Sequence, residues 1–143
     1  MTTQNQQIKC YALALKMLMR REHSQLELSK KLQQKGFNDV DIKHSIDLLI
    51  EQKYQSDERF SEAFIIMRYN QGKGPVIISS ELKKRGIESF DLSIIDWFEL
   101  VKEVRKKKFG QNLPSDYKTQ SKQKRFLKSR GFSFDQINKA FPR

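Results

Sequence analysis

Apolar side chains recur along this chain every three or four residues, which is the spacing that places them on one face of an α-helix. The first such helix is predicted from Gln6 to Arg21, and its apolar face consists of Ile8, Tyr11, Leu15 and Leu18. A later helix opens at the acidic Asp57, and its apolar residues are Phe60, Ala63, Phe64 and Met67. No stretch alternates apolar and polar residues over a useful length, so strands are not expected. The pattern predicts an all-α protein.

Three segments repeat one short pattern: "KKLQQKGF" from residue 30, "ELKKRGI" from residue 81 and "RFLKSRGF" from residue 125. Aligned on their glycines, they share apolar residues four positions before, one after and six after. The aligned sets are Leu32, Gly36, Phe37, Ile42; then Leu82, Gly86, Ile87, Leu92; then Leu127, Gly131, Phe132, Ile137. Glycine lacks the Cβ that penalises positive φ, so it suits the left-handed residue that ends a helix. Each segment therefore predicts a helix, a tight stop and a new helix.

Residues that cap helix N-termini follow these stops or precede the next helix. "SQLE" from Ser24 and "SFDQ" from Ser133 have the spacing of a capping box, and Asn38 is a good N-cap. After Gly86 the caps are weaker, and a helix is expected to begin there at Glu88 or Ser89. The caps divide the chain into short helices that must be stabilised by packing.

The remaining boundaries complete a threefold plan. Pro75 fits the first position of a helix after "GKGP", Asp96 caps a helix that runs to about Phe109, and "GQNLP" then interrupts the chain. Nine short helices are predicted in three tandem helix-turn-helix-like units, each of three helices, with boundaries at residues 1–53, 54–95 and 96–143. Repeats of this length favour an elongated, curved array.

The charge is unevenly distributed along the 143 residues. The net charge is +11, yet residues 1–100 hold 15 Lys and Arg against 14 Asp and Glu. Residues 101–143 hold 13 Lys and Arg against 3 Asp and Glu. A balanced body with a strongly basic end predicts a polyanionic partner, with DNA or RNA first and an acidic protein surface second.

The basic residues form clusters that are the candidate binding sites. The first two clusters end the second helix of their repeats and consist of Lys30, Lys31, Lys35 and of Lys83, Lys84, Arg85. There, interaction with the helix dipole and binding of a polyanion remain equally open. The third consists of Lys122, Lys124, Arg125, Lys128, Arg130 and the nearby Arg105, Lys106, Lys107, Lys108. This cluster carries more positive charge than a favourable interaction with a helix dipole requires. It therefore favours binding of nucleic acid, mainly through the phosphate backbone of the nucleic acid.

Catalytic and metal-binding patterns are missing from the sequence. His23 and His44 are 21 residues apart without metal-ligand spacing, and both are expected on exposed helix surfaces. The lone Cys10 is expected to be buried, and "GKG" at residues 72–74 lacks the pattern of a phosphate-binding loop. We therefore expect no enzyme activity, cofactor or metal. No apolar run approaches the ~20 residues that span a bilayer, and a monomeric cytosolic protein is expected.

Four segments of the chain together resemble the RecX family, the bacterial regulators of the RecA recombinase. The similar segments are "RREHSQLELSKKLQQKGF" from residue 20, "SDERFSEAF" from 56, "GKGPVIISSELKKRGI" from 72 and "RFLKSRGFSFDQI" from 125. They cover nearly the whole chain in the family's order. Mild departures at His23, Gln25 and Tyr54 to Ser56 leave the repeat skeleton intact.

The resemblance implies a modulator of RecA that is not an enzyme. Such a protein lies in the groove of the RecA–DNA filament, inhibits its ATPase, strand-exchange and co-protease activities, and also binds DNA, for which the residues themselves predict little sequence preference. Two alternatives stay open: a DNA- or RNA-binding protein that acts without RecA, and a helical scaffold for another acidic partner. Whether the protein would cap filament ends or coat their length also stays open.

Overall fold

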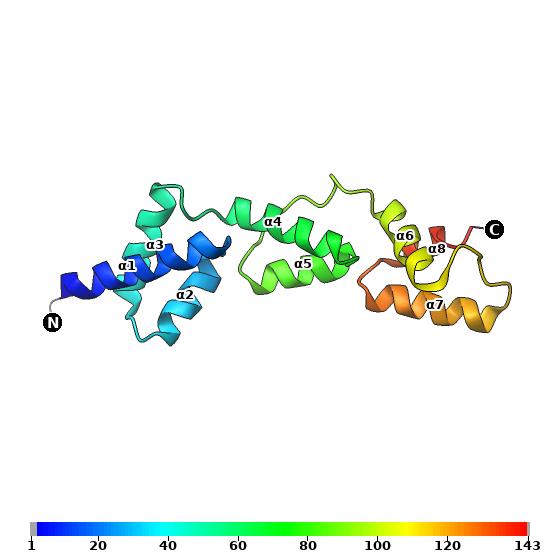
Figure 1. Ribbon diagram of the computed structural model, residues 1–143, viewed down its shortest axis with the longest axis horizontal. Helices are drawn as coiled ribbons and strands as arrows, with labels where there is room; N and C mark the ends of the chain where they lie inside the picture. The colour runs from blue at the N-terminus through cyan, green and yellow to red at the C-terminus, as the bar shows by residue number, and fades with distance from the viewer. Residues whose placement is uncertain (1–2, 143) are drawn as a thin grey trace. The chain divides into compact units, whose positions relative to one another are not determined.

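The computed structural model describes residues 3–142, which fold into eight α-helices and no strand (Figure 1). In chain order the helices are α1 (Thr3–Arg20), α2 (Gln25–Gln34), α3 (Asp39–Glu51), α4 (Asp57–Asn70), α5 (Pro75–Lys84), α6 (Trp97–Phe109), α7 (Tyr117–Ser129) and α8 (Phe134–Lys139). The chain forms two compact units. Unit 1 combines Met1–Ala63 with Leu82–Phe90, and unit 2 combines Phe64–Glu81 with Asp91–Arg143.

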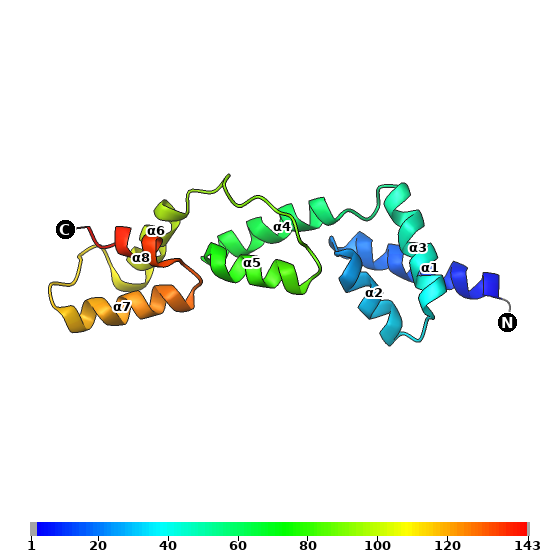
Figure 2. The same cartoon turned by 180° about the vertical axis from the view of Figure 1, so that it is seen from behind.

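Unit 1 is built on the packing of α1, α2 and α3 around one hydrophobic core (Figure 2). The buried residues of this core are Cys10, Ala14, Leu28, Leu32, Ile42, Ile46 and Leu49. The predicted apolar face of α1 is partly wrong, because Ile8 is 61% exposed. The small side chains of Cys10 and Ala14 form the centre of that face instead. They allow α1 to pack closely against α3, while Tyr11 and Leu18 contact the core from its flanks.

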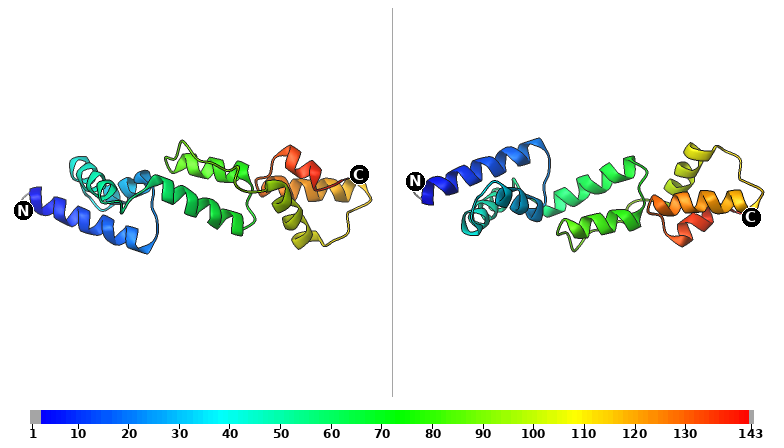
Figure 3. Two further views of the ribbon diagram at one scale, coloured as in Figure 1. Left: turned by 90° about the horizontal axis from the view of Figure 1, so that it is seen from above. Right: turned by 90° about the horizontal axis from the view of Figure 1, so that it is seen from below.

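In unit 2, helices α6, α7 and α8 pack against one another around a second core (Figure 3). Its buried apolar residues on these helices and the adjoining segments are Trp97, Leu100, Val101, Leu127, Phe132, Ile137, Ala140 and Phe141. The rings of Phe109 and Phe126 meet edge to face beside it, with centroids 5.3 Å apart. This core fixes the directions of α6 and α7, the two helices that carry most of the basic residues of unit 2.

The three predicted helix stops are confirmed. Gly36, Gly86 and Gly131 have φ of +92°, +82° and +97°. Each is followed by an apolar residue whose N–H donates to the carbonyl of the aligned leucine. These bonds are Phe37 to Leu32 (3.2 Å), Ile87 to Leu82 (3.0 Å) and Phe132 to Leu127 (3.3 Å). The geometry is that of a Schellman motif, and all three leucines are fully buried.

The predicted helix starts are confirmed as well. Both capping boxes form: the hydroxyls of Ser24 and Ser133 accept from the backbone N–H three residues later, and the serine backbone N–H donates back to the side chain of Glu27 or Gln136. Asn38 caps α3, Asp96 caps α6, and Pro75 is the first residue of α5. The sequence signals at helix ends are local, which is why they can be recognised without the fold.

The ninth predicted helix is wrong. Glu88 and Ser89 lie in an irregular segment that ends in a turn before α6. Here the Asp91 carboxylate accepts from the N–H (2.9 Å) and the hydroxyl (2.6 Å) of Ser93, which holds the chain in a turn. These local hydrogen bonds compete with helix formation, and the segment has no strong N-cap that would favour a helix. The second repeat therefore has two helices, and the repeat boundaries at residues 53 and 95 stay a prediction.

The predicted apolar face of α4 is half right. Phe60 and Phe64 are buried, whereas Ala63 and Met67 are exposed. The buried stripe is rotated toward Ser61 and Ile65. The hydroxyl of Ser61 donates to the Asp57 carbonyl (2.8 Å), so a polar residue can occupy a buried position there. Because a polar residue lies within the buried stripe, the pattern of apolar residues in the sequence does not locate the centre of that stripe.

Candidate nucleic-acid and filament interface

The basic residues predicted as a third cluster lie on α6, on α7 and at the C-cap of α7, all in unit 2, and apart from Arg105 we call them the basic cluster. It consists of Lys106, Lys107, Lys108, Lys122, Lys124, Arg125, Lys128 and Arg130. On α7, Lys122, Arg125 and Lys128 are exposed on the side opposite the buried Gln123 and Leu127. Within residues 3–142, none of these three forms an ion pair. Their charges are therefore available to an external anion.

Arg105, which the sequence predicted as a binding residue, does not belong to this surface because it is buried. Its side chain is 1% exposed. One guanidinium nitrogen donates to the Gln123 amide oxygen (3.2 Å), and the other donates to the carbonyls of Gly110 (2.9 Å) and Gln111 (3.2 Å). These three hydrogen bonds compensate the buried charge of Arg105, and two of them hold the loop that follows α6. Its position next to three lysines in the sequence gives no sign of this.

Two members of the basic cluster donate hydrogen bonds within unit 2. Lys124 donates to the side-chain oxygen of Asn138 (3.4 Å), and its Nζ lies 5.4 Å from the centroid of the Phe141 ring. Arg130 donates to the Gln71 carbonyl (2.8 Å), and its guanidinium lies 5.9 Å from the centroid of the Phe126 ring. Both side chains are half-buried. These contacts hold the two cations in fixed positions at the edge of the cluster.

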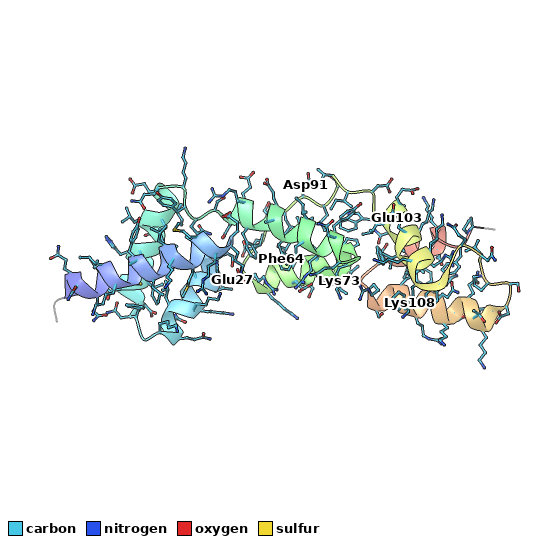
Figure 4. All side chains as sticks on the ribbon, in the orientation of Figure 1. Glu27, Phe64, Lys73, Asp91, Glu103 and Lys108 are labelled. Carbon is cyan, nitrogen blue, oxygen red and sulfur yellow. The ribbon has the colours of Figure 1, made fainter. Side chains whose placement is uncertain are left out.

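Lys107, Lys108 and Arg130 also border a pocket of about 620 Å³ in unit 2. The pocket has an apolar wall of Leu100, Val104 and Phe126 and includes the acidic Glu103. Glu103 and Lys108 both project from α6 (Figure 4). We call this hollow the α6–α7 pocket. Two prominent features of the unit, a cationic surface and an apolar hollow, thus adjoin each other.

The first predicted cluster lies on α2 and just beyond its end, in unit 1. Lys30 and Lys35 are exposed, whereas Lys31 is half-buried and donates to Nε2 of His23 (2.8 Å). His23 is 2% exposed, so its predicted surface position is wrong, while His44 is exposed as expected. The other ring nitrogen of His23 donates to the Arg21 carbonyl (3.0 Å) in the tautomer that satisfies both bonds.

The buried ring of His23 is held in its neutral form. Burial lowers the pKa of His23, the bond to the Arg21 carbonyl opposes this, and the charges of Arg21 and Lys31 lower it further. A neutral ring leaves Nε2 free to accept from Lys31. The residue therefore acts as a structural link between the start of α2 and the interior of that helix.

The second cluster lies at the C-terminal end of α5 and is part of unit 1. Lys83 and Lys84 are exposed, and Arg85 is half-buried with its Nε 3.7 Å from the Glu27 carboxylate. Glu27 also bonds Arg21 (3.2 Å) and belongs to the capping box of α2. Burial would raise the pKa of Glu27, but its bonds from Arg21 and Ser24 lower it overall. Arg85 therefore joins α5 to α2 within unit 1.

The charge of the chain is concentrated in unit 2. The residues of unit 1 comprise 13 Lys and Arg against 10 Asp and Glu, and those of unit 2 comprise 15 against 7. Sequence reasoning missed two further cations there. Lys118 is exposed one turn before Lys122 on α7, and Lys139 is exposed with its Nζ 4.5 Å from the centroid of the Phe98 ring. The helical period of α7 could have identified Lys118.

Two further classes of site are missing from residues 3–142. No group of three or more His, Cys, Asp or Glu side chains could hold a metal ion. None of the helices in the described part is both long enough and apolar enough to cross a membrane.

Comparison with known proteins gives a consistent result along the chain. Models of the first, second and third three-helix domains of RecX match residues 10–49, 56–92 and 95–141. Proteins named regulatory protein RecX are similar over most of the chain. That of Pseudomonas entomophila L48 is 39% identical over 132 residues (88% of this chain, 85% of the relative), and that of Halorhodospira halophila is 35% identical over 133 residues (89% and 83%).

Solved structures show the same fold. The crystal structure of RecX from Lactobacillus salivarius gives a TM-score of 0.80 at 24% identity and covers 95% of this chain and 94% of that one. A second crystal structure, of a regulatory protein RecX, gives a TM-score of 0.81 at 24% identity and covers 95% and 73%. At this identity the likeness extends to the fold alone.

Proposed function

The chain belongs to the RecX family of regulatory proteins, and from this we propose that it regulates the RecA recombinase. It binds the RecA–DNA filament and lowers its ATPase, strand-exchange and co-protease activities. It acts as a monomer in the cytoplasm and by binding, without chemistry of its own. The observation that carries the proposal is the exposed basic cluster, whose members on α7 lack ion-pair partners in the described part of the chain.

The basic cluster suits the phosphate backbone of DNA. Lys122, Arg125 and Lys128 follow one exposed face of a helix and so present several charges to one strand. Lysines and arginines that neutralise phosphates release counterions, and this provides affinity without reading the bases. Because unit 1 is nearly balanced in charge, unit 2 is the better candidate for the DNA contact.

Part of the predicted binding set has another role and is left out of the proposal. Arg105 is buried, Lys31 bonds His23, and Arg85 pairs with Glu27. The exposed Lys30, Lys35, Lys83 and Lys84 remain candidates for further contacts from unit 1. Lys118 joins the basic cluster as a new candidate, because it shares the exposed face of Lys122.

The alternative is a basic protein that binds DNA or RNA without RecA, and the basic cluster by itself fits that function too. Capture of purified RecA by the immobilised protein separates the two. We expect RecA to bind after nuclease treatment and to bind more strongly once DNA and a nucleotide let filaments form. Capture of DNA alone, with no retention of RecA in either condition, would favour the alternative.

A further inference from the structure

The α6–α7 pocket combines cations and apolar surface in a way that the proposed function does not use. Lys107, Lys108 and Arg130 border it, and Leu100, Val104 and Phe126 form its wall. Its volume of about 620 Å³ lies in the range of pockets that bind small molecules or single groups of a larger ligand. All of its residues belong to unit 2.

The guanidinium of Arg130 is held at the edge of the pocket. It donates to the Gln71 carbonyl (2.8 Å) and lies 5.9 Å from the centroid of the Phe126 ring. Its Nε is buried without a hydrogen-bond partner within the described residues. Lys108 lies near the same ring, with its Nζ 5.5 Å from the centroid. Two cations thus lie near one aromatic ring at the edge of the pocket.

Gly72 keeps the pocket open on its other side. A Cβ at this position would lie 3.2 Å from Cγ2 of Val104 and 3.8 Å from Nη2 of Arg130. The residue also has φ of +74°, which side chains rarely adopt. Without a side chain here, both the apolar wall and the guanidinium remain accessible from the loop between α4 and α5.

We propose that the α6–α7 pocket binds one nucleotide of a single DNA strand. The phosphate contacts Lys107, Lys108 and Arg130, and the base lies against Val104, Leu100 and Phe126. Aromatic and aliphatic surface stabilises unstacked bases of any sequence, while cations hold the backbone beside it. Glu103 and the side chains of Asn70 and Gln71 provide polar groups near the base edge.

This ligand explains more of the pocket than an acidic peptide would. A carboxylate would use the three cations but leave Val104 and Phe126 facing water. A phosphate joined to a planar, weakly polar base uses both surfaces at once. The inference rests on the proposed function, since it assumes that unit 2 contacts DNA.

The test compares binding of two oligonucleotides of equal length, one of thymidylates and one abasic, to the full-length protein. Both have the same phosphates, so the ratio of their affinities isolates the contribution of the bases. We expect the wild type to favour the thymidylate strand by on the order of tenfold. Val104→Trp, which fills the pocket, should bring the ratio close to one. Lys106→Gln should weaken both oligonucleotides and leave the ratio unchanged, because Lys106 lies outside the pocket.

Each result has a distinct meaning. Equal affinity of the wild type for both strands would overturn the pocket assignment and leave the proposed function intact. Failure to bind either strand would overturn the DNA contact of the proposed function together with this inference. If Val104→Trp fails to fold by circular dichroism, Val104→Ser, which removes apolar surface that the base contacts, replaces it. A ratio that falls no further in Val104→Ser than in Lys106→Gln would then contradict the proposal.

NMR separates the possible sources of the ligand. Thymidine monophosphate is expected to shift the amide signals of Val104 and Phe126 only at high concentration, and the thymidylate strand at much lower concentration. Saturation by the free nucleotide at concentrations as low as for the strand would contradict a strand site and indicate a mononucleotide site. Stronger shifts with an acidic peptide such as oligoglutamate would overturn the nucleotide proposal.

Discussion

Gly131 lies so close to Ile77 that a Cβ on the glycine would come within 2.6 Å of Cγ1 of the isoleucine. The start of α5 is therefore packed directly on the helix stop after α7. Gly74 contributes to the same joint. Its N–H donates to the Arg130 carbonyl (2.7 Å), and that of Val76 donates to the Gly131 carbonyl (2.9 Å). Gly131 therefore ends α7 and also leaves the space into which the start of α5 packs.

Unit 1 contains a joint of the same kind. A Cβ on Gly86 would lie 2.9 Å from Cβ of Leu26, at the start of α2. The ion pair between Arg85 and Glu27 lies beside it. Gly36 has the same helix stop, but among residues 3–142 no atom outside its immediate chain neighbours comes within 4 Å of its Cβ position. The repeated glycine therefore has one conformational role at all three positions and a packing role at two.

These joints predict unequal effects of alanine substitution. Gly36→Ala should lower the free energy of unfolding by about 1 kcal/mol, because alanine disfavours positive φ. Gly131→Ala should lower it by a further 1–3 kcal/mol or so, because the methyl group collides with Ile77 in a packed joint. Urea denaturation followed by circular dichroism measures both. Equal losses in the two variants would contradict the packing role.

Arg105 and Lys106 provide a second matched pair. Arg105→Ala should cost about 3 kcal/mol of stability, because it leaves the carbonyls of Gly110 and Gln111 without their donor. Lys106→Ala should change stability by no more than about 0.5 kcal/mol, as is usual for an exposed residue. Thermal unfolding of the two variants checks this. A stable Arg105→Ala protein with weakened DNA binding would restore Arg105 to the binding surface.

His23 predicts a pH dependence of stability. Its pKa in the folded protein is lowered from the usual 6.5, so the unfolded chain takes up the proton at higher pH. The stability that depends on the neutral ring is complete above pH 6.5 and is lost as the pH falls from there toward the folded pKa. The stability advantage of the wild type over His23→Gln, which does not titrate, should shrink over that range. An advantage that is constant or grows on acidification would contradict the buried neutral ring.

The basic cluster predicts a change in the salt dependence of DNA binding. Replacing Lys122, Arg125 and Lys128 by Gln should reduce the slope of log K against log salt by about three, because each of these cations is expected to neutralise one phosphate. The matched control removes the same number of exposed charges from unit 1, at Lys30, Lys83 and Lys84. Fluorescence anisotropy at several salt concentrations measures both slopes. An equal reduction of the slope in the control variant would contradict the assignment of the DNA contact to unit 2.

Local signals account for what the sequence predicted well. Ser24, Asn38, Asp96 and Ser133 cap their helices through bonds to the next turn, and the glycine stops need only one residue of special conformation. Such features are encoded within a few neighbouring residues. They were sufficient to place most helix ends and to predict an all-α fold.

Tertiary burial accounts for the predictions that were wrong. His23 and Arg105 are polar residues whose partners lie on other segments or in the following loop, so neither pattern nor composition reveals their burial. The segment around Asp91 forms a turn because a side chain replaces the helical hydrogen bonds. The α6–α7 pocket also requires the fold, since its cations come from α6 and the end of α7, far apart in the sequence.

The most direct test of the proposed function is the DNA-dependent ATPase of RecA titrated with this protein. We expect hydrolysis to fall as the protein is added, at substoichiometric amounts if it caps filament ends and near equal amounts if it coats them. The variant with Lys122, Arg125 and Lys128 replaced by Glu should need a large excess for the same inhibition. Hydrolysis that stays unchanged at a large excess of folded wild-type protein would contradict the account.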